Sequence, residues 1–131
     1  MNPVNTVGVS GRGLAWQFRN AFPKNYSAYH AACSQGEVKV GNMFVHMNDS
    51  ASWKQHWIVN FPTKRHWRDM SRMEDIESGL QALKEWVLQN DVQTIAVPQL
   101  GCGLGGLAWR EVLPLVEAAF SDAPTCAFVY G

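Results

Sequence analysis

The sequence has little cysteine and no long apolar run. Its three cysteines, Cys33, Cys102 and Cys126, are odd in number, far apart and without a Cys-x-x-Cys pair, which argues against a disulfide framework and a structural zinc site. No apolar stretch reaches the roughly eighteen residues of a transmembrane helix, and the N-terminus lacks the charged start and apolar segment of a signal peptide. We therefore expect a soluble, cytoplasmic protein without a metal site or a membrane contact.

The chain also lacks an excess of charge of either sign. Eleven Lys and Arg residues balance eleven Asp and Glu residues, which excludes the strongly basic field of a general nucleic-acid coat protein. Any contact with DNA or RNA is therefore expected to be local. With 131 residues, 47% of them hydrophobic, and no repeat or low-complexity linker, the chain is predicted to form a single domain over residues 1–131.

Segments typical of strands and helices alternate along the chain. Strands are predicted at residues 3–7, 43–47, 57–61, 94–98 and 127–130, and helices at residues 13–22, 26–34, 73–90 and around 112–120, with Pro114 near the first turn of the last one. The helix at 73–90 has the clearest pattern, because apolar residues recur every three or four positions and Ser71 with Glu74 matches a capping box. This alternation predicts an α/β sandwich whose ligand lies at the carboxyl ends of the strands.

Two glycine-rich loops follow predicted strands and lead into predicted helices. The first spans residues 8–13 (GVSGRG) and the second residues 101–106 (GCGLGG). Such loops let backbone N–H groups close around an anion at a helix N-terminus, although a single loop of this kind is as often a tight turn. Two loops at equivalent positions favour a bound diphosphate.

The second loop also fits the pattern G-x-G-x-x-G of dinucleotide-binding proteins. That pattern requires an acidic residue about 20 positions further on to hold a ribose hydroxyl, and residues 125–128 (TCAF) contain none. Neither loop continues into Gly-Lys-Ser/Thr, so a Walker loop is absent as well. An ordinary NAD-dependent dehydrogenase is therefore disfavoured.

Three segments together resemble a known family. Residues 3–15 (PVNTVGVSGRGLA), 60–68 (NFPTKRHWR) and 98–109 (PQLGCGLGGLAW) are similar to the macrodomains that bind and remove ADP-ribose, above all to the DarG-like antitoxins that reverse ADP-ribosylation of thymidine in DNA. The resemblance implies a three-layer, macrodomain-like α/β/α sandwich with a mixed central sheet. Compared with the family this chain is shortened at its N-terminus, so one sheet edge is expected to be exposed and to allow a homodimer.

The resemblance also assigns roles to matching positions. Lys64 is the expected catalytic residue, Asn5 is expected to contact the distal ribose, and no metal or organic cofactor is implied. A related hydrolase that acts on ADP-ribosyl-glutamate has an Asp that assists its lysine, and Gly105 stands at that position here. The expected ADP-ribose-binding residues are Asn5, Thr6, Gly8, Val9, Ser10, Gly11, Gly13, Leu100, Gly101, Cys102, Gly103, Leu104 and Gly105.

The segment around Lys64 is locally basic. Four basic residues against Asp69 give residues 64–72 a net charge of +3, and the expected nucleic-acid-binding residues in it are Arg65, His66, Trp67 and Arg68. Arginines bind phosphates and an exposed tryptophan stacks on an unpaired base, although Trp67 would serve equally well in the core. The neighbouring arginines also favour the free amine of Lys64, the form that acts as a nucleophile.

The leading hypothesis is an ADP-ribosyl hydrolase that removes ADP-ribose from nucleic-acid bases, with thymidine in single-stranded DNA as its substrate. ADP-ribose is then both ligand and product. Hydrolysis of ADP-ribosyl-glutamate on proteins and non-catalytic binding of ADP-ribose stay open as alternatives.

Overall fold

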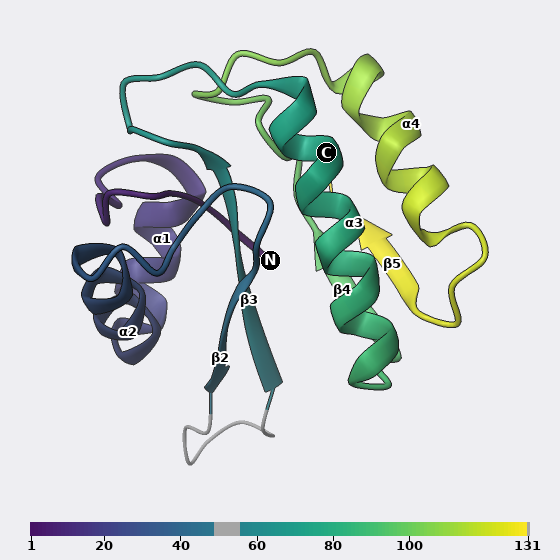
Figure 1. Ribbon diagram of the computed structural model, residues 1–131, viewed down its shortest axis with the longest axis horizontal. Helices are drawn as coiled ribbons and strands as arrows, with labels where there is room; N and C mark the ends of the chain where they lie inside the picture. The colour runs from purple at the N-terminus through teal and green to yellow at the C-terminus, as the bar shows by residue number, and fades with distance from the viewer. Residues whose placement is uncertain (49–55, 131) are drawn as a thin grey trace.

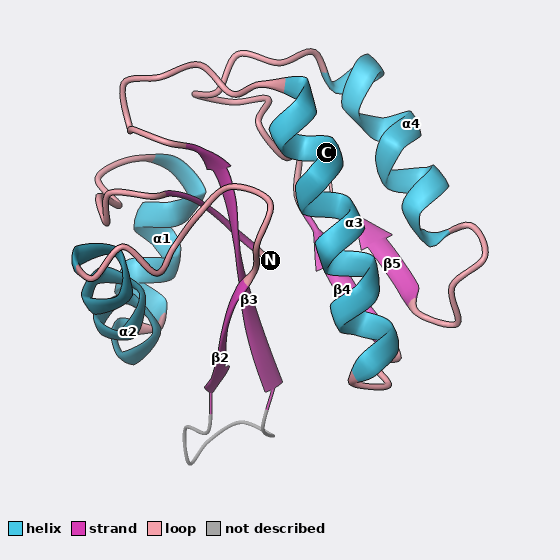
Figure 2. Cartoon of the chain, in the orientation of Figure 1, coloured by secondary structure: helices cyan, strands magenta, loops and turns pink. Residues whose placement is uncertain are grey.

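Helices cover both faces of a central sheet in the computed structural model, which describes residues 1–48 and 56–130 (Figures 1 and 2). In these residues the strands are β1 (Asn2–Asn5), β2 (Phe44–Asn48), β3 (His56–Lys64), β4 (Thr94–Val97) and β5 (Cys126–Val129). The helices are α1 (Gly13–Ala21), α2 (Pro23–Ser34), α3 (Met73–Gln89) and α4 (Trp109–Phe120). Each of these elements was predicted from the sequence, most of them with shifted ends.

The sheet is mixed and consists of two hydrogen-bonded parts. β3 lies between β1, to which it is parallel, and β2, to which it is antiparallel, while β4 and β5 form a parallel pair. The parts meet where the nitrogen of Met1 donates to the carbonyl oxygen of Ala96 over 2.8 Å. Parallel strands bring their carboxyl ends to one edge, so the loops after β1 and β3 meet there.

Side chains of β3 alternate between the two faces of the sheet. Val59 and Phe61 belong to a core shared with α3, α4 and β4, whereas Asn60 bonds to Asn25 of α2 on the opposite face. A smaller core joins β1 to α2 through Val4 and Tyr29, among others. The expected three layers are therefore confirmed, with α1 and α2 on one side and α3 and α4 on the other (Figure 1).

β3 extends three residues beyond its predicted end at Phe61. The prediction followed the apolar run, which ends at Phe61, and the next residue, Pro62, cannot donate a hydrogen bond within a sheet. In the structure β2 begins at Phe44, opposite Asn60, and runs away from the end of β3, so the last part of β3 has only β1 beside it, with Val4 opposite Pro62. Proline is tolerated there as on an edge strand, and the extension carries Lys64 to the sheet edge.

The predicted capping box at the start of α3 is wrong. The residue that caps the helix is Arg72, without a side-chain bond to the helix, and the buried hydroxyl of Ser71 has no hydrogen-bond partner within the described residues. Ser71 is instead held through its backbone N–H, which donates to the carbonyl oxygen of Gly105 over 2.9 Å. A contact between distant loops thus overrides the local cap.

Two prolines lie differently from their predicted places. α2 begins at Pro23, where the missing N–H is not needed, and not at Tyr26. Pro114 is the sixth residue of α4, because the helix already starts at Trp109.

Among the described strands, β2 and β5 lie at the two edges of the sheet, since the two sheet parts meet beside β1 and β4, and the edge with exposed apolar side chains is β5. On this strand and just after it, Phe128, Val129 and Tyr130 are 52%, 39% and 64% exposed, in agreement with the exposed edge expected from the sequence. Association of two copies through this edge stays a prediction. Among the described residues, every helix is too short or too polar to cross a membrane.

Replacing Gly79 by alanine tests the packing of α3 on β3. A Cβ atom at Gly79 would overlap the ring of Phe61, which is fully buried. Overpacking of this kind costs about 1–3 kcal/mol, which outweighs the gain of about 1 kcal/mol in helix propensity. We expect Gly79→Ala to lower the free energy of unfolding in urea. Gln81→Ala, at an exposed position of α3, is the control, and equal stability of both variants would contradict this packing.

Candidate functional site

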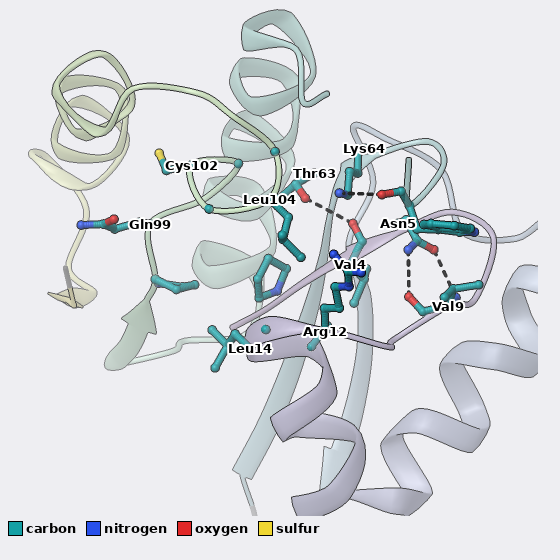
Figure 3. A pocket seen from close by; sticks show the side chains of 18 of the residues that line it. Val4, Asn5, Val9, Arg12, Leu14, Thr63, Lys64, Gln99, Cys102 and Leu104 are labelled. Carbon is teal, nitrogen blue, oxygen red and sulfur yellow. Dashed lines mark hydrogen bonds between the residues drawn. The ribbon is translucent and has the colours of Figure 1, made fainter. Parts of the chain in front are cut away.

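A cavity of about 500 Å³ lies at the carboxyl ends of β1 and β3 and beside the loop after β4. Its walls come from loop 1 (residues 6–12), loop 2 (residues 98–108) and the start of α1. Figure 3 shows Lys64 and Thr63 at the end of β3, Arg12 beside Leu14 at the start of α1, and Leu104 of loop 2 between them. The lining residues are Pro3, Val4, Asn5, Val9, Gly11, Arg12, Gly13, Leu14, Ala15, Thr63, Lys64, Trp67, Pro98, Gln99, Gly101, Cys102, Gly103, Leu104 and Gly105.

Most of the predicted site residues lie in this cavity. Those that line it are Asn5, Val9, Gly11, Gly13, Lys64, Trp67, Gly101, Cys102, Gly103, Leu104 and Gly105, and those that do not are Thr6, Gly8, Ser10, Arg65, His66, Arg68 and Leu100. Leu100 is fully buried in the main core. The two glycine loops and the lysine are thus brought together, although they are up to about 100 positions apart in the chain.

The cavity also has lining residues that the sequence analysis missed. Arg12 lies inside the first glycine motif, where a search for glycines passes over it, and Pro98 and Gln99 open the third motif. Thr63 precedes Lys64 directly, so the resemblance already marked its position. Leu14 and Ala15 lie on the first turn of α1, which only the folded structure brings beside loop 2.

Loop 1 is folded around the side chain of Asn5. Its Oδ1 accepts from the backbone N–H groups of Val7, Gly8 and Val9 over 3.1, 3.1 and 3.3 Å, and its Nδ2 donates to the carbonyl oxygen of Val9 over 2.8 Å. The buried hydroxyl of Tyr29 in α2 lies 2.7 Å from the carbonyl oxygen of Asn5. Asn5 therefore shapes the loop, in addition to facing the cavity.

Loop 2 is packed so closely that side chains are excluded at one of its glycines. A Cβ atom at Gly105 would overlap the hydroxyl of Ser71 and come within 2.5 Å of the carbonyl oxygen of Gly101. An aspartate at this position would therefore force loop 2 to move. By contrast, a Cβ atom at Gly103 meets nothing within 4 Å, so the free protein has room for a side chain there.

Lys64 ends β3 with its amine at the cavity. The Nζ atom donates to the carbonyl oxygen of Trp67 over 3.0 Å. Burial lowers the pKa of Lys64, and the charge of Asp69 opposes that change. The pKa moves in the expected direction, but the expected cause was wrong, since partial burial and not the neighbouring arginines is responsible. The lysine has a larger fraction of free amine than an exposed lysine would have.

Arg65 holds the backbone next to Lys64 in place. Its carbonyl oxygen accepts from both the hydroxyl and the N–H of Thr6, over 2.6 and 3.3 Å. Its guanidinium lies 3.3 Å from the carboxylate of Asp75, whose side chain is only 8% exposed. Arg65 is thus engaged in an ion pair, and 49% of its side chain stays exposed to solvent.

The next three residues form a stack at the rim of the cavity. The ring of His66 lies 5.3 Å from that of Trp67 at an angle of 30°, and the guanidinium of Arg68 lies 4.5 Å from the centre of the Trp67 ring. Trp67 is 44% exposed. It is therefore a surface residue and not a core residue, the two roles that the sequence left open.

Lys64 brings an amine to the site, and the described residues hold no cluster of the side chains that usually bind metals. Among residues 1–48 and 56–130 there is no group of three or more His, Cys, Asp or Glu side chains placed to hold a metal ion. Cys102 lines the cavity, and burial raises the pKa of its thiol, which disfavours the reactive thiolate.

The sequence profile of the Macro domain family matches residues 1–116. The chain belongs to this family. Over 119 residues the macrodomain is 48% identical to a DNA ADP-ribosyl glycohydrolase of Thermus aquaticus, a match that covers 91% of this chain and 33% of the relative. The chain thus spans about a third of the length of the curated relatives it matches.

Two solved structures are similar to the whole macrodomain. The macrodomain of Mycobacterium tuberculosis DarG has a TM-score of 0.92 and 41% identity, over 98% of this chain and 85% of that one. Thermosipho africanus DarTG in complex with ADP-ribose has a TM-score of 0.91 and 38% identity, over 98% of this chain and 36% of that one. The fold expected from the sequence is thereby confirmed.

The lowered pKa of Lys64 predicts a change in stability. The ordinary value is 10.5, so between the lowered pKa and 10.5 the unfolded chain binds more protons, and stability rises with pH in that window. Below this pH range Lys64 is protonated in both the folded and the unfolded chain, so partial burial of its ammonium group lowers stability by its full amount. We expect Lys64→Met to raise Tm at pH 7 and the gain to shrink as the pH approaches 10, measured by thermal unfolding. Lys39→Met, at an exposed position, controls for loss of one charge, and an equal gain there would refute the explanation.

Proposed function

We propose that this macrodomain is a DNA ADP-ribosyl glycohydrolase that removes ADP-ribose from thymidine in single-stranded DNA. One observation carries the proposal: the partly buried amine of Lys64 lies at a cavity between two glycine loops, and the packing around Gly105 excludes an acidic side chain there. The lysine is therefore the side chain in the cavity that is suited to nucleophilic attack. The names of the similar proteins support the same activity.

The two glycine loops and the start of α1 form the proposed binding site of the diphosphate. Arg12 precedes α1, no side chain caps that helix, and no acidic residue lies in its first turn. Free backbone N–H groups and the positive end of a helix attract a phosphate. The guanidinium of Arg12 adds a charge-assisted donor at the cavity wall.

Lys64 is the proposed nucleophile toward the distal ribose. The lone pair of its amine forms a bond to the anomeric carbon while the bond from that carbon to the base breaks. The base leaves with the electron pair of that bond and takes up the proton lost by the amine. Water then hydrolyses the adduct, which releases ADP-ribose and restores the amine.

The surface around the cavity fits a nucleic acid better than an acidic peptide. Trp67 offers an exposed aromatic ring, and Arg68 is exposed beside it. Apolar side chains at the rim, Val9 and Leu104, are 42% and 58% exposed. Bases stack or pack on such side chains and phosphates pair with arginine, so a strand gains contacts here that a glutamate side chain would lack.

Lys64 variants test the mechanism. We expect Lys64→Ala to lose turnover of an ADP-ribosylated oligonucleotide by at least about a hundredfold, since one catalytic group commonly contributes that much or more. We expect Lys64→Arg to be equally inactive, because a guanidinium stays protonated and cannot attack. Release of ADP-ribose is measured by chromatography, and calorimetry checks that both variants still bind ADP-ribose.

Each other outcome points to one alternative. An active arginine variant would assign the lysine a purely electrostatic role. Binding of ADP-ribose without turnover by the wild type would indicate a reader module. Turnover of ADP-ribosyl-glutamate protein but not of the oligonucleotide would indicate a protein hydrolase. Lys39→Ala, at an exposed position that does not line the cavity, is the control for loss of charge.

A substitution in loop 2 tests the proposed binding site independently of Lys64. Gly103→Val adds a side chain at a position with free space in the unliganded protein, so we expect an unchanged Tm. The same side chain would occupy the cavity beside the proposed diphosphate site, and we expect ADP-ribose affinity to fall more than tenfold. Gly103→Ala is the graded control, with a smaller loss. Undiminished binding by the valine variant would remove loop 2 from the site.

A further inference from the structure

Although the net charge of the chain is zero, its basic and acidic residues are distributed unevenly between the two halves of the sequence. Residues 1–72 carry nine of the eleven Lys and Arg residues and three of the eleven acidic residues, a net charge of +6. Residues 73–131 carry two basic and eight acidic residues, a net charge of −6. A molecule that is neutral as a whole therefore has one strongly positive and one strongly negative part.

The two halves of the sequence also occupy opposite sides of the molecule, in contact along the main core (Figure 1). Residues up to 72 form α1, α2 and the sheet part β1-β3-β2, and the rest form α3, α4 and the pair β4-β5 (Figure 1). The cavity lies where the halves meet, since loop 1 and Lys64 belong to the positive half and loop 2 to the negative half. A polyanion that reaches the cavity is attracted over the first half and repelled over the second.

The positive half, residues 1–72, carries two side-chain stacks of similar composition. The first is the His66, Trp67 and Arg68 stack described above. In the second, the guanidinium of Arg19 lies 4.3 Å from the centre of the Tyr26 ring, and the ring of His30 stacks on Tyr26 at 5.6 Å and 27°. Each stack thus joins an arginine, an aromatic ring and an imidazole.

Both stacks form hydrogen bonds with segments that contribute lining residues to the cavity. In the first, the carbonyl oxygen of Trp67 accepts from Lys64. In the second, the Tyr26 hydroxyl and Nδ1 of His30 lie 3.3 and 3.0 Å from the carbonyl oxygen of Gly8 in loop 1. A carbonyl oxygen only accepts, so His30 carries its proton on Nδ1 in this arrangement. The second stack therefore supports the side of loop 1 formed by α2.

We propose that the Arg19–Tyr26–His30 stack is a second contact site for single-stranded DNA, which binds the strand next to the ADP-ribosylated base. The arginine pairs with a phosphate and the exposed parts of the stack pack on a base, as in other sites for single strands. Loop 1 connects this stack to the cavity and exposes Val7 by 43% and Val9 by 42%. The strand then runs from Trp67 over loop 1 to α2 and avoids α3 and α4.

This inference rests on the proposed function, and it is tested with Arg19→Gln. Arg19 contacts the Tyr26 ring but does not line the cavity, so the variant leaves the bonds to loop 1 intact. For a long oligonucleotide with one ADP-ribosylated thymidine, we expect KM to rise severalfold with kcat unchanged. We also expect the slope of log KM against log salt to decrease by roughly 0.7, the value for one phosphate contact. An ADP-ribosylated thymidine mononucleotide has no neighbouring nucleotide to place on the stack and keeps its KM.

Arg110→Gln is the matched control, because it removes the same charge from an exposed position of α4 in the negative half. Equal changes in both variants, or none in Arg19→Gln, would overturn the second contact site. Weaker binding of free ADP-ribose by Arg19→Gln would also overturn it, since the arginine would then only support loop 1. Failure of the proposed function gives a different result, because the wild-type protein would then hydrolyse no oligonucleotide. In that case fluorescence anisotropy with an unmodified labelled strand still compares DNA binding by the two variants and so tests the second contact site.

Discussion

The carboxamide of Asn5 is the constraint on which the site depends. At the end of β1 a single side chain gathers three successive backbone N–H groups and returns a bond to Val9, which turns the chain into loop 1. Without that turn α1 would not begin beside the cavity. Tyr29, 1% exposed, bonds to the backbone of Asn5 from α2, so the position of loop 1 follows from the packing of an entire helix on the sheet.

In contrast to Asn5, Lys64 lowers the stability of the fold, because its ammonium group is partly buried. An ammonium group at the end of a strand, partly buried and bonded to one carbonyl oxygen, is less well solvated than on an exposed loop. The same burial that disfavours the charge increases the fraction of free amine. Its backbone neighbour Arg65 is tied to Thr6 and Asp75, and these bonds hold the lysine in place. The burial of Lys64 thus lowers stability and favours the chemical form that the proposed activity requires.

Sequence patterns predicted what depends on near neighbours. The apolar spacing of α3 placed that helix to within one residue at its end, and three motifs identified the loops and Lys64. The patterns failed where a distant segment decides the outcome. Ser71 was assigned as a cap, but its N–H bonds to Gly105, 34 positions away. The lowered pKa of Lys64 comes from burial, which depends on the packing of distant segments and is invisible in the charges that flank it.

The division of charge is compatible with the proposed local binding of DNA by a protein whose net charge is zero. At physiological ionic strength charges act over about 8 Å, so a strand experiences the nearest surface and not the net charge. A strand over α1 and α2 is near the basic half, whereas one over α3 and α4 is near the acidic half. The repulsion contributes as much to orientation as the attraction does, because it excludes the reverse placement. A uniformly basic surface would attract DNA without this preference for one orientation. Because the cavity lies at the junction of the two halves, the proposed function would combine guidance of the strand by the basic half with recognition of the ADP-ribose group in the cavity.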